Sequence, residues 1–291
     1  MEQRGKPKVV NYTSHADRSV GILLFESYKM MKISTYLSER RVRLSHQWAR
    51  VFLSLSIGLM LPGATYAQNS PTGNELQILQ TLNQLLGEEQ AELYQKIIPA
   101  DQAISWQVYL PSNDLSEKPG VFVYVSPRKT GQIDSRWRSV MDQQNLIYIA
   151  ADDSGNRIGV SRRMVLATMA IRALAQQYSF AQDRIIVSGF SGGGRIASKL
   201  ATQYPEVFTG AIYICGADFW KKDQTPKLER LLQNKYVFVT GSRDFNLDET
   251  RRVHRRYINA GAAQSMLLII PGMAHAHPDG NALTEALEYL N

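Results

Sequence analysis

The sequence I-I-V-S-G-F-S-G-G-G-R-I-A at residues 185–197 joins a β-prone run to a helix-forming run across a glycine-rich turn. The apolar residues 185–187 predict the end of a buried strand, and residues 195–200 predict a helix. Between them lies Gly189-Phe190-Ser191-Gly192-Gly193, which fits the pattern G-x-S-x-G. In this strand–turn–helix context the pattern predicts a nucleophile elbow.

Glycines two positions before and two positions after Ser191 have a steric role in such an elbow. The turn is so tight that side chains at Gly189 and Gly193 would collide with the backbone around them. Ser191 would then stand clear of the sheet in front of a helix N-terminus, whose partial positive charge suits an oxyanion. The alternative is an ordinary glycine-rich turn before a packed helix.

The net charge of +7 comes almost entirely from the N-terminal part of the 291-residue chain. Residues 1–67 carry 10 Lys/Arg and 4 Asp/Glu, whereas residues 68–291 carry 23 and 22. The basic character therefore belongs to a leader and not to the main domain. We expect no nucleic-acid partner and no stable membrane association once the leader is removed.

Residues 1–67 have the pattern of a leader that contains a signal peptide. Four arginines between residues 40 and 50 precede an apolar run at residues 51–61, and Ala64-Thr65-Tyr66-Ala67 predicts cleavage after Ala67. A secreted or periplasmic protein is therefore expected. An uncleaved membrane anchor is the alternative, although the apolar run is short for a span and ends at Pro62-Gly63.

Apolar runs beyond the leader alternate between strand and helix patterns. Predicted strands cover residues 104–110, 121–125, 146–150, 185–187, 210–215, 236–240 and 265–270, and predicted helices cover residues 134–144, 160–178, 195–200, 226–233, 247–259 and 281–290. This order predicts an α/β fold with a doubly wound, mostly parallel sheet flanked by helices and no large lid domain. We divide the chain into the leader (1–67), a linker with N-terminal helices (68–99) and the α/β domain (100–291).

Histidine is the side chain best suited to act as a base for Ser191 near neutral pH. His275 lies in the loop after the last predicted strand, where it can reach over the elbow, and His277 is the alternative. His254 lies among arginines on a predicted helix, where we expect a solvated face. The His-x-His pair could also bind a metal ion, but Asp279 is its only nearby carboxylate, so we expect no metal and no cofactor.

A carboxylate that orients the base is expected at the end of the preceding strand. Asp244 has this position, with Asp248 and Asp218 as alternatives. The resulting chain order Ser, Asp, His is that of α/β-hydrolases. The single cysteine, Cys215, excludes an intrachain disulfide, and we expect it to be a core residue and not a nucleophile.

An oxyanion hole requires two hydrogen-bond donors, normally backbone amides. Gly192, directly after the predicted nucleophile, would supply the first. The second should come from the loop after the predicted strand 121–125, where Pro127 has no N–H. We therefore predict the amide of Arg128, with Ser126 as the alternative.

Three motifs in this order, G-F-S-G-G-G-R, G-S-R-D-F-N and P-G-M-A-H-A-H-P, resemble α/β-hydrolase esterases of the polyhydroxybutyrate-depolymerase and feruloyl-esterase type. The resemblance covers residues 100–291. It implies an exported serine hydrolase that cleaves small-molecule or polymer esters through an acyl-enzyme without a cofactor. By motif position it makes Ser191 the nucleophile, Asp244 the acid and His275 the base.

One departure from this family concerns the first oxyanion loop. Such enzymes often carry His-Gly there, whereas this chain has Ser126-Pro127. A serine peptidase or acyltransferase on the same fold, and a non-catalytic exported binding protein, remain alternative readings of the sequence.

Overall fold

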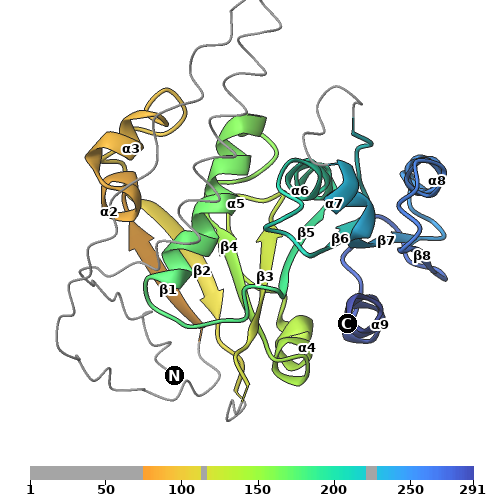
Figure 1. The fold of residues 1–291 in the computed structure, drawn as a ribbon. Helices are drawn as coiled ribbons and strands as arrows, with labels where there is room; N and C mark the ends of the chain where they lie inside the picture. Colours follow the sequence, from red (N-terminus) through yellow and green to blue (C-terminus); the bar gives the residue numbers. More distant parts are fainter. Residues whose placement is uncertain (1–74, 113–116, 221–227) are drawn as a thin grey trace, which may run out of the picture.

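The computed structural model describes residues 75–112, 117–220 and 228–291 (Figure 1). The predicted signal peptide and its cleavage site lie outside these ranges. No described helix combines the length and the apolar character that crossing a membrane requires.

The described part of the chain forms one mixed sheet of eight strands. From one edge to the other the strands are β1 (Glu75–Gln80), β2 (Ile104–Tyr109), β4 (Leu146–Ala151), β3 (Gly120–Val125), β5 (Ile185–Phe190), β6 (Gly210–Ile214), β7 (Lys235–Gly241) and β8 (Ser265–Ile270). The pairs β1–β2 and β2–β4 are antiparallel, and all other neighbouring pairs are parallel. The sheet is therefore mostly parallel, as the sequence predicts.

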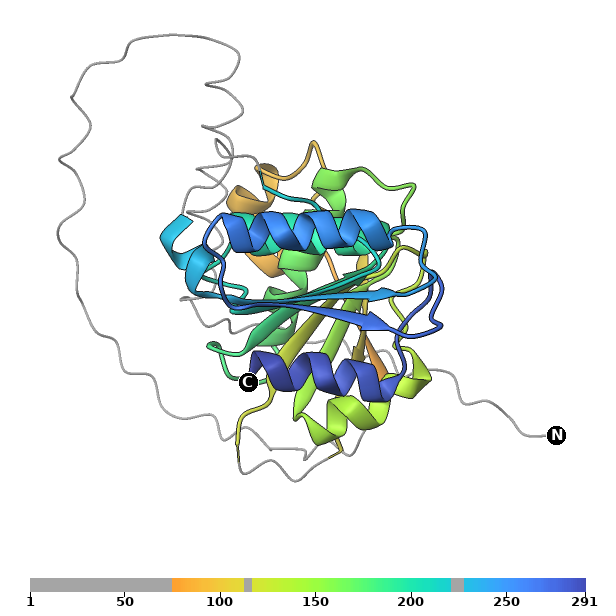
Figure 2. The ribbon, with the colours of Figure 1, turned by 90° about the vertical axis from the view of Figure 1, so that its right-hand side faces the viewer.

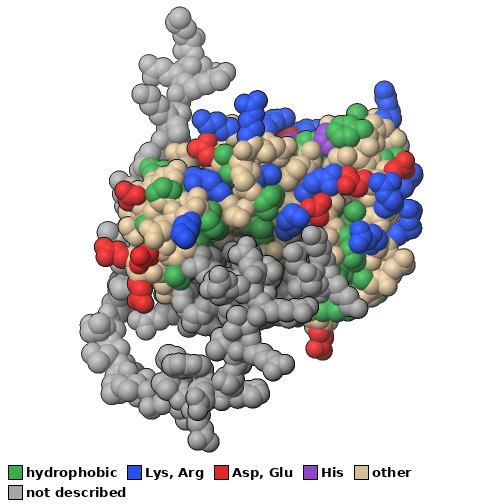
Figure 3. All heavy atoms as spheres, turned by 90° about the horizontal axis from the view of Figure 1, so that it is seen from above, with side chains coloured by type: hydrophobic (Ala, Val, Ile, Leu, Met, Phe, Trp, Pro, Cys, Tyr) green, Lys and Arg blue, Asp and Glu red, His purple; other side chains and the backbone are tan. Residues whose placement is uncertain are grey.

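Helices cover both faces of this sheet (Figures 1 and 2). One face carries α2 (Leu82–Leu86), α3 (Glu88–Glu92), α5 (Val160–Ala175), α6 (Gly192–Gln203), α7 (Leu228–Gln233) and α8 (Leu247–Asn259). The opposite face carries the 3₁₀ turn η1 (Ser135–Trp137), α4 (Arg138–Gln143) and α9 (Gly280–Leu290). On the face covered by α5, α6 and α8, Lys and Arg side chains lie among Asp and Glu side chains (Figure 3).

Two hydrophobic cores result, one on each face of the sheet. Every residue of β3 and β4 is buried, which is typical of parallel strands covered on both sides. Val121 and Val123 belong to the core beneath α5 and α6, whereas Phe122 and Tyr124 belong to the core beneath α4 and α9. Because both faces of these strands are buried, their sequences are unbroken apolar runs.

The N-terminal helices predicted within residues 68–99 are wrong for the first described segment. Glu75–Gln80 forms β1, which pairs with β2 along its whole length, and helix begins only after Thr81, whose side chain caps α2 in a capping box with Gln84. Leucines in this segment also satisfy a helical spacing, but pairing with an open sheet edge decides the conformation.

The chain reverses its direction across the sheet next to β3. From β3 it crosses through α4 to β4 on one side, and from β4 it returns through α5 to β5 on the other side. Ligand sites of open α/β sheets lie at such a reversal, beyond the carboxyl ends of the strands. The loops after β3, β4 and β5 meet there.

Candidate active site

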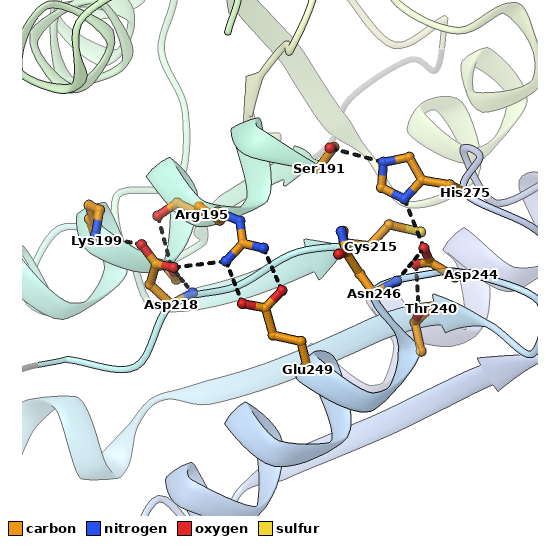
Figure 4. A network of polar contacts seen from close by, with 11 residues as sticks. Ser191, Arg195, Lys199, Cys215, Asp218, Thr240, Asp244, Asn246, Glu249 and His275 are labelled. Atoms are coloured by element: carbon orange, nitrogen blue, oxygen red, sulfur yellow. Dashed lines mark hydrogen bonds and ion pairs between the residues drawn. The ribbon is translucent and has the colours of Figure 1, made fainter.

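Ser191 is held at the sharp turn between β5 and α6 (Figure 4). Its backbone has φ 56° and ψ −120°, a conformation that non-glycine residues rarely adopt. Its amide donates to the carbonyl of Ile214 at 2.8 Å, and its own carbonyl accepts from Arg195 at 3.2 Å. The structure therefore contains the strained elbow that G-x-S-x-G predicts.

The glycines around the elbow are sterically necessary. A Cβ atom on Gly189 would lie 2.4 Å from the carbonyl of Gly193, and one on Gly193 would lie 1.9 Å from the carbonyl oxygen of Val125. Both approaches are far inside van der Waals contact. The close packing of α6 on β5 and β3 thus depends on the missing side chains.

Ser191, His275 and Asp244 form a continuous hydrogen-bonded chain (Figure 4). His275 Nε2 lies 2.9 Å from Ser191 Oγ, and His275 Nδ1 lies 2.8 Å from Asp244 Oδ1. His275 comes from the loop after β8, and Asp244 comes from the loop after β7. The structure brings together all three residues that the sequence predicts, each from the carboxyl end of a different parallel strand.

Asp244 is buried, and several donors hold its charged form. Thr240 Oγ1 donates to its Oδ2 at 2.8 Å, and the amide of Asn246 donates to its Oδ1 at 2.9 Å. Burial alone raises the pKa of Asp244, but hydrogen bonds from the Asn246 amide, Cys215, His275 and Thr240 outweigh it, so the pKa lies below its ordinary value. Asp244 is therefore a carboxylate that accepts from the Nδ1–H of His275.

Cys215 is buried behind this chain and has no exposed sulfur for chemistry. Its Sγ lies 3.6 Å from the carbonyl oxygen of Ala276 and beside Asp244, and its one proton can donate to either of these acceptors. Burial raises the pKa of the thiol well above its ordinary value, and hydrogen bonding to Asp244 adds to the shift. Cys215, Asp244 and His275 lie close enough to hold a metal ion. A metal ligand must be a thiolate, however, so these groups fit a hydrogen-bonded relay better.

His277 is held by partners other than Ser191 and anchors the loop after β8. Its Nε2 accepts from the Tyr124 hydroxyl at 2.9 Å, and its Nδ1 lies 3.3 Å from Asp134 Oδ2. Burial lowers the pKa of His277, and Asp134 counteracts this only in part. The indole of Trp137 donates to the carbonyl of Pro278 at 3.0 Å. Between the two histidines, it is His275 and not His277 that the structure joins to Ser191.

The alternative carboxylates lie elsewhere. Asp218 pairs with Arg195 and Lys199 at 3.1 and 2.6 Å, in a separate cluster visible beside the elbow helix in Figure 4. Asp248 is exposed in the first turn of α8 and lies 3.5 Å from Arg251. His254 is half-buried and not simply solvated, because its Nε2 lies 3.2 Å from the carbonyl of Ser265.

Of the two predicted oxyanion donors, only Gly192 has a backbone amide without a competing acceptor in its own element. Gly192 is the first residue of α6, where helical amides have no partner within the helix. The amide of Arg128 instead donates to Ser126 Oγ within its own loop at 3.1 Å. A role for Arg128 in an oxyanion hole stays a prediction, because the hydroxyl of Ser126, two residues earlier, is a competing acceptor for its amide.

Arg163 is a buried residue of the site that sequence reasoning missed. From the start of α5 its guanidinium donates to the carbonyls of Ser154 at 2.6 Å, Gly192 at 3.2 Å and Ser126 at 3.1 Å. Burial lowers its pKa to about 10, and no carboxylate in the described ranges pairs with it. This one side chain joins the loops after β3 and β4 to the elbow helix.

Two aromatic rings flank the imidazole of His275. The Phe190 and Phe245 rings lie 4.8 and 4.1 Å from the imidazole centroid. Phe245 is 79% exposed, although it is a large apolar side chain. The site thus carries an apolar surface directly beside the imidazole.

Known proteins resemble the chain in structure and not in sequence. No protein-family model matches it, and no curated protein sequence matches it. A ferulic acid esterase structure is similar with a TM-score of 0.54, at 14% identity over 75% of this chain and 97% of that one. The fluorophosphonate-binding serine hydrolase FphF of Staphylococcus aureus is similar with a TM-score of 0.53, at 13% identity over 76% of this chain and 100% of that one.

At such low identity these similarities establish the fold alone. The mostly parallel eight-stranded sheet and the helices on both of its faces fit the same fold. The predicted fold class is confirmed: residues 75–291, where described, have the α/β-hydrolase fold.

Proposed function

We propose that the protein is an exported serine hydrolase that cleaves carboxylic esters through an acyl-enzyme. The observation that carries this proposal is the hydrogen-bonded chain from Ser191 through His275 to the buried carboxylate of Asp244. Serine needs such a base and such an orienting group to become a nucleophile. The names of the two structural neighbours, an esterase and a serine hydrolase, agree with it.

In the first half of the reaction Ser191 Oγ attacks the ester carbonyl carbon while its proton moves to His275 Nε2. Asp244 holds Nδ1–H and stabilises the imidazolium that forms. The carbonyl electron pair moves to oxygen, where the amide of Gly192 donates to it. Collapse of this intermediate expels the alcohol, which takes the proton from His275.

In the second half water attacks the acyl-enzyme, and the acid is released. His275 accepts a proton from the water and then returns it to Ser191 Oγ. Phe245, exposed beside His275, would contact an apolar group of the ester. Small-molecule esters and exposed esters of polymers are the proposed substrates, acted on without a cofactor.

The location proposed for this activity is outside the cytoplasm, either in the periplasm or secreted. The support is the leader pattern of residues 1–67, with four arginines, an apolar run and a cleavage motif ending at Ala67.

Hydrolysis of short p-nitrophenyl esters and labelling by a fluorophosphonate probe test the proposal. Wild-type protein should do both, and Ser191→Ala should do neither while it unfolds at a temperature close to that of wild type. Peptide substrates assayed in parallel separate an esterase from a peptidase on the same triad. Wild-type protein inert toward both esters and the probe would exclude ester hydrolysis and favour a non-catalytic binding protein.

A further inference from the structure

The loop after β4 lies against the loop after β3 at the mouth of the site. The amide of Asn156 donates to the carbonyl of Pro127 at 3.0 Å, and the amide of Asp153 donates to the carbonyl of Lys129 at 2.6 Å. Gly155 lies so close to the Arg128 carbonyl that a Cβ atom would come within 2.9 Å of its oxygen. The first oxyanion loop therefore has a second loop fixed along it.

The side chain of Asn156 extends from this loop onto the elbow helix. A Cβ atom on Gly192 would lie 2.3 Å from Asn156 Oδ1 and 3.1 Å from Asn156 Nδ2. The carboxamide thus occupies the space into which a side chain directly after Ser191 would project. The Gly192 amide, the predicted first oxyanion donor, is one bond away from the Cα that the carboxamide contacts.

This carboxamide is available for a ligand. Asn156 is exposed, and its side chain makes no hydrogen bond to any other residue that the structure describes. The terminal torsion of asparagine is broad, so its –NH₂ can turn toward a group above Ser191 without a change of backbone. The neighbouring backbone candidate, Arg128, is by contrast held by Ser126 Oγ.

Arg163 fixes the position of Asn156 relative to the elbow. Its Nε donates to Ser154, two residues before Asn156, and its Nη1 donates to Gly192. One buried side chain therefore holds both the loop that carries the carboxamide and the helix N-terminus that it contacts. Arg163 thus fixes the backbone from which the carboxamide projects, so that only the side-chain torsions of Asn156 must settle for its –NH₂ to donate to a developing oxyanion.

We propose that the side-chain amide of Asn156 is the second donor of the oxyanion hole, an inference that rests on the proposed ester hydrolysis. When the bond from Ser191 Oγ to the carbonyl carbon forms, the π pair moves to the carbonyl oxygen and the Ser191 proton moves to His275. The resulting oxyanion accepts from Gly192 N–H and from Asn156 Nδ2–H. In this arrangement the side-chain amide of Asn156 takes the place of the backbone amide expected from the His-Gly loop of the esterases that the sequence resembles.

The test compares Asn156→Ala and Asn156→Asp with wild type on p-nitrophenyl acetate. Loss of one oxyanion donor should lower kcat by about 10²-fold and leave KM within about threefold. Affinity for a trifluoromethyl ketone, which forms a tetrahedral oxyanion on the serine, should fall by a similar factor. Asn156→Asp keeps the side-chain shape but lacks the donor and adds negative charge, so its loss should be at least as large.

The matched control is Arg157→Gln, an exposed neighbour in the same loop, which should behave like wild type. Active wild-type protein together with an Asn156→Ala kcat within about threefold of wild type would overturn the inference and leave the proposed function intact. A change in KM with unchanged kcat would also overturn the inference, because it marks a contact made equally with the substrate and with the transition state. Wild-type protein without any esterase activity would instead overturn the proposed function itself. If Asn156→Ala does not fold stably, the comparison of kcat with wild type is made with Asn156→Asp instead.

Discussion

Ser191 combines a strained backbone with glycine neighbours that make the strain tolerable. Residues in such sparsely populated conformations are retained where the surrounding structure over-determines them, at a cost of about 1–3 kcal/mol each. Here the surroundings are the bond from the Ser191 amide to Ile214 and the contact of Gly193 with the Val125 carbonyl. The elbow is therefore a property of three strands and not of its own five residues.

Gly193→Ala should disrupt this arrangement, because its methyl group would lie 1.9 Å from the backbone oxygen of Val125. We expect a loss of unfolding free energy of about 3 kcal/mol or more, together with loss of esterase activity. Urea unfolding measures the first effect. Gly159→Ala is the control, since nothing lies within 4 Å of a Cβ there, and a similar loss in both variants would contradict the steric argument.

Asp244→Asn should leave the fold intact and remove most of the activity. An amide at this position no longer stabilises the imidazolium of His275, and its –NH₂ favours the wrong tautomer of the ring. We expect kcat for p-nitrophenyl acetate to fall about 10³–10⁴-fold. Asp248→Asn, in the first turn of α8, should retain wild-type kcat; equal losses in the two variants would show that Asp244 does not orient the base.

At the scale of elements, Arg163 joins α5, the loops after β3 and β4, and the N-terminus of α6. A buried guanidinium with three carbonyl partners cannot be removed without leaving those acceptors unpaired. At about 1–3 kcal/mol for a buried acceptor left unpaired, Arg163→Met should lower the free energy of unfolding by about 3 kcal/mol. Chemical denaturation measures this change.

Arg163→Lys separates charge from geometry at this position. Lysine keeps the positive charge but cannot reach three acceptors with a planar fork. We expect it to recover part of the stability while kcat stays well below that of wild type. Full recovery of kcat by lysine would show that the charge alone matters and that the loop positions do not.

The success of prediction from sequence varied with the element. The strands β3 and β4 could be predicted because burial on both faces of the sheet leaves unbroken apolar runs in the sequence. β1 could not be predicted in this way, since Leu76 and Leu79 have a helical spacing and only pairing with β2 makes this segment a strand. The proximity of Asp244 and His275 to Ser191 could be predicted because sites of parallel sheets lie beyond the carboxyl ends of the strands, and these two residues follow β7 and β8. Asn156 and Arg163 act across loops far apart in the chain, and no local pattern marks such contacts.

The stability of the whole molecule should depend on pH through His277. Burial lowers its folded-state pKa, and Arg128 and Arg136 add to this, while Asp134 opposes it. The unfolded chain, with a pKa near 6.5, therefore binds the proton more readily. The free energy of unfolding should decline as pH falls below about 6.5 and continue to decline down to the folded pKa.

Urea titrations at pH 7.5 and 5.5 measure this decline, and His277→Gln should make it shallower. The carboxylates Asp134, with a pKa of about 2, and Asp244, with a lowered pKa, contribute in a separate window below about pH 4. An identical decline in wild type and His277→Gln between pH 7.5 and 5.5 would contradict the assignment.

Export of the whole molecule can be checked at its N-terminus. The chain expressed in a bacterium with a secretion pathway should be recovered outside the cytoplasm with Gln68 as its first residue, as measured by intact mass. Ala67→Arg should block this processing, because signal peptidases require a small residue there. Recovered protein that retains residues 51–67 would favour the membrane-anchor alternative.

The loop that carries His275 is tethered at every position from 275 to 278. Asp244 holds the first residue, Cys215 the second, and Tyr124 and Trp137 the next two. If this loop alone were grafted onto another scaffold, its imidazole would lose its fixed position, because the four side chains that hold the loop come from other parts of the domain. A design that reuses His275 must therefore include these four hydrogen-bonding partners as well.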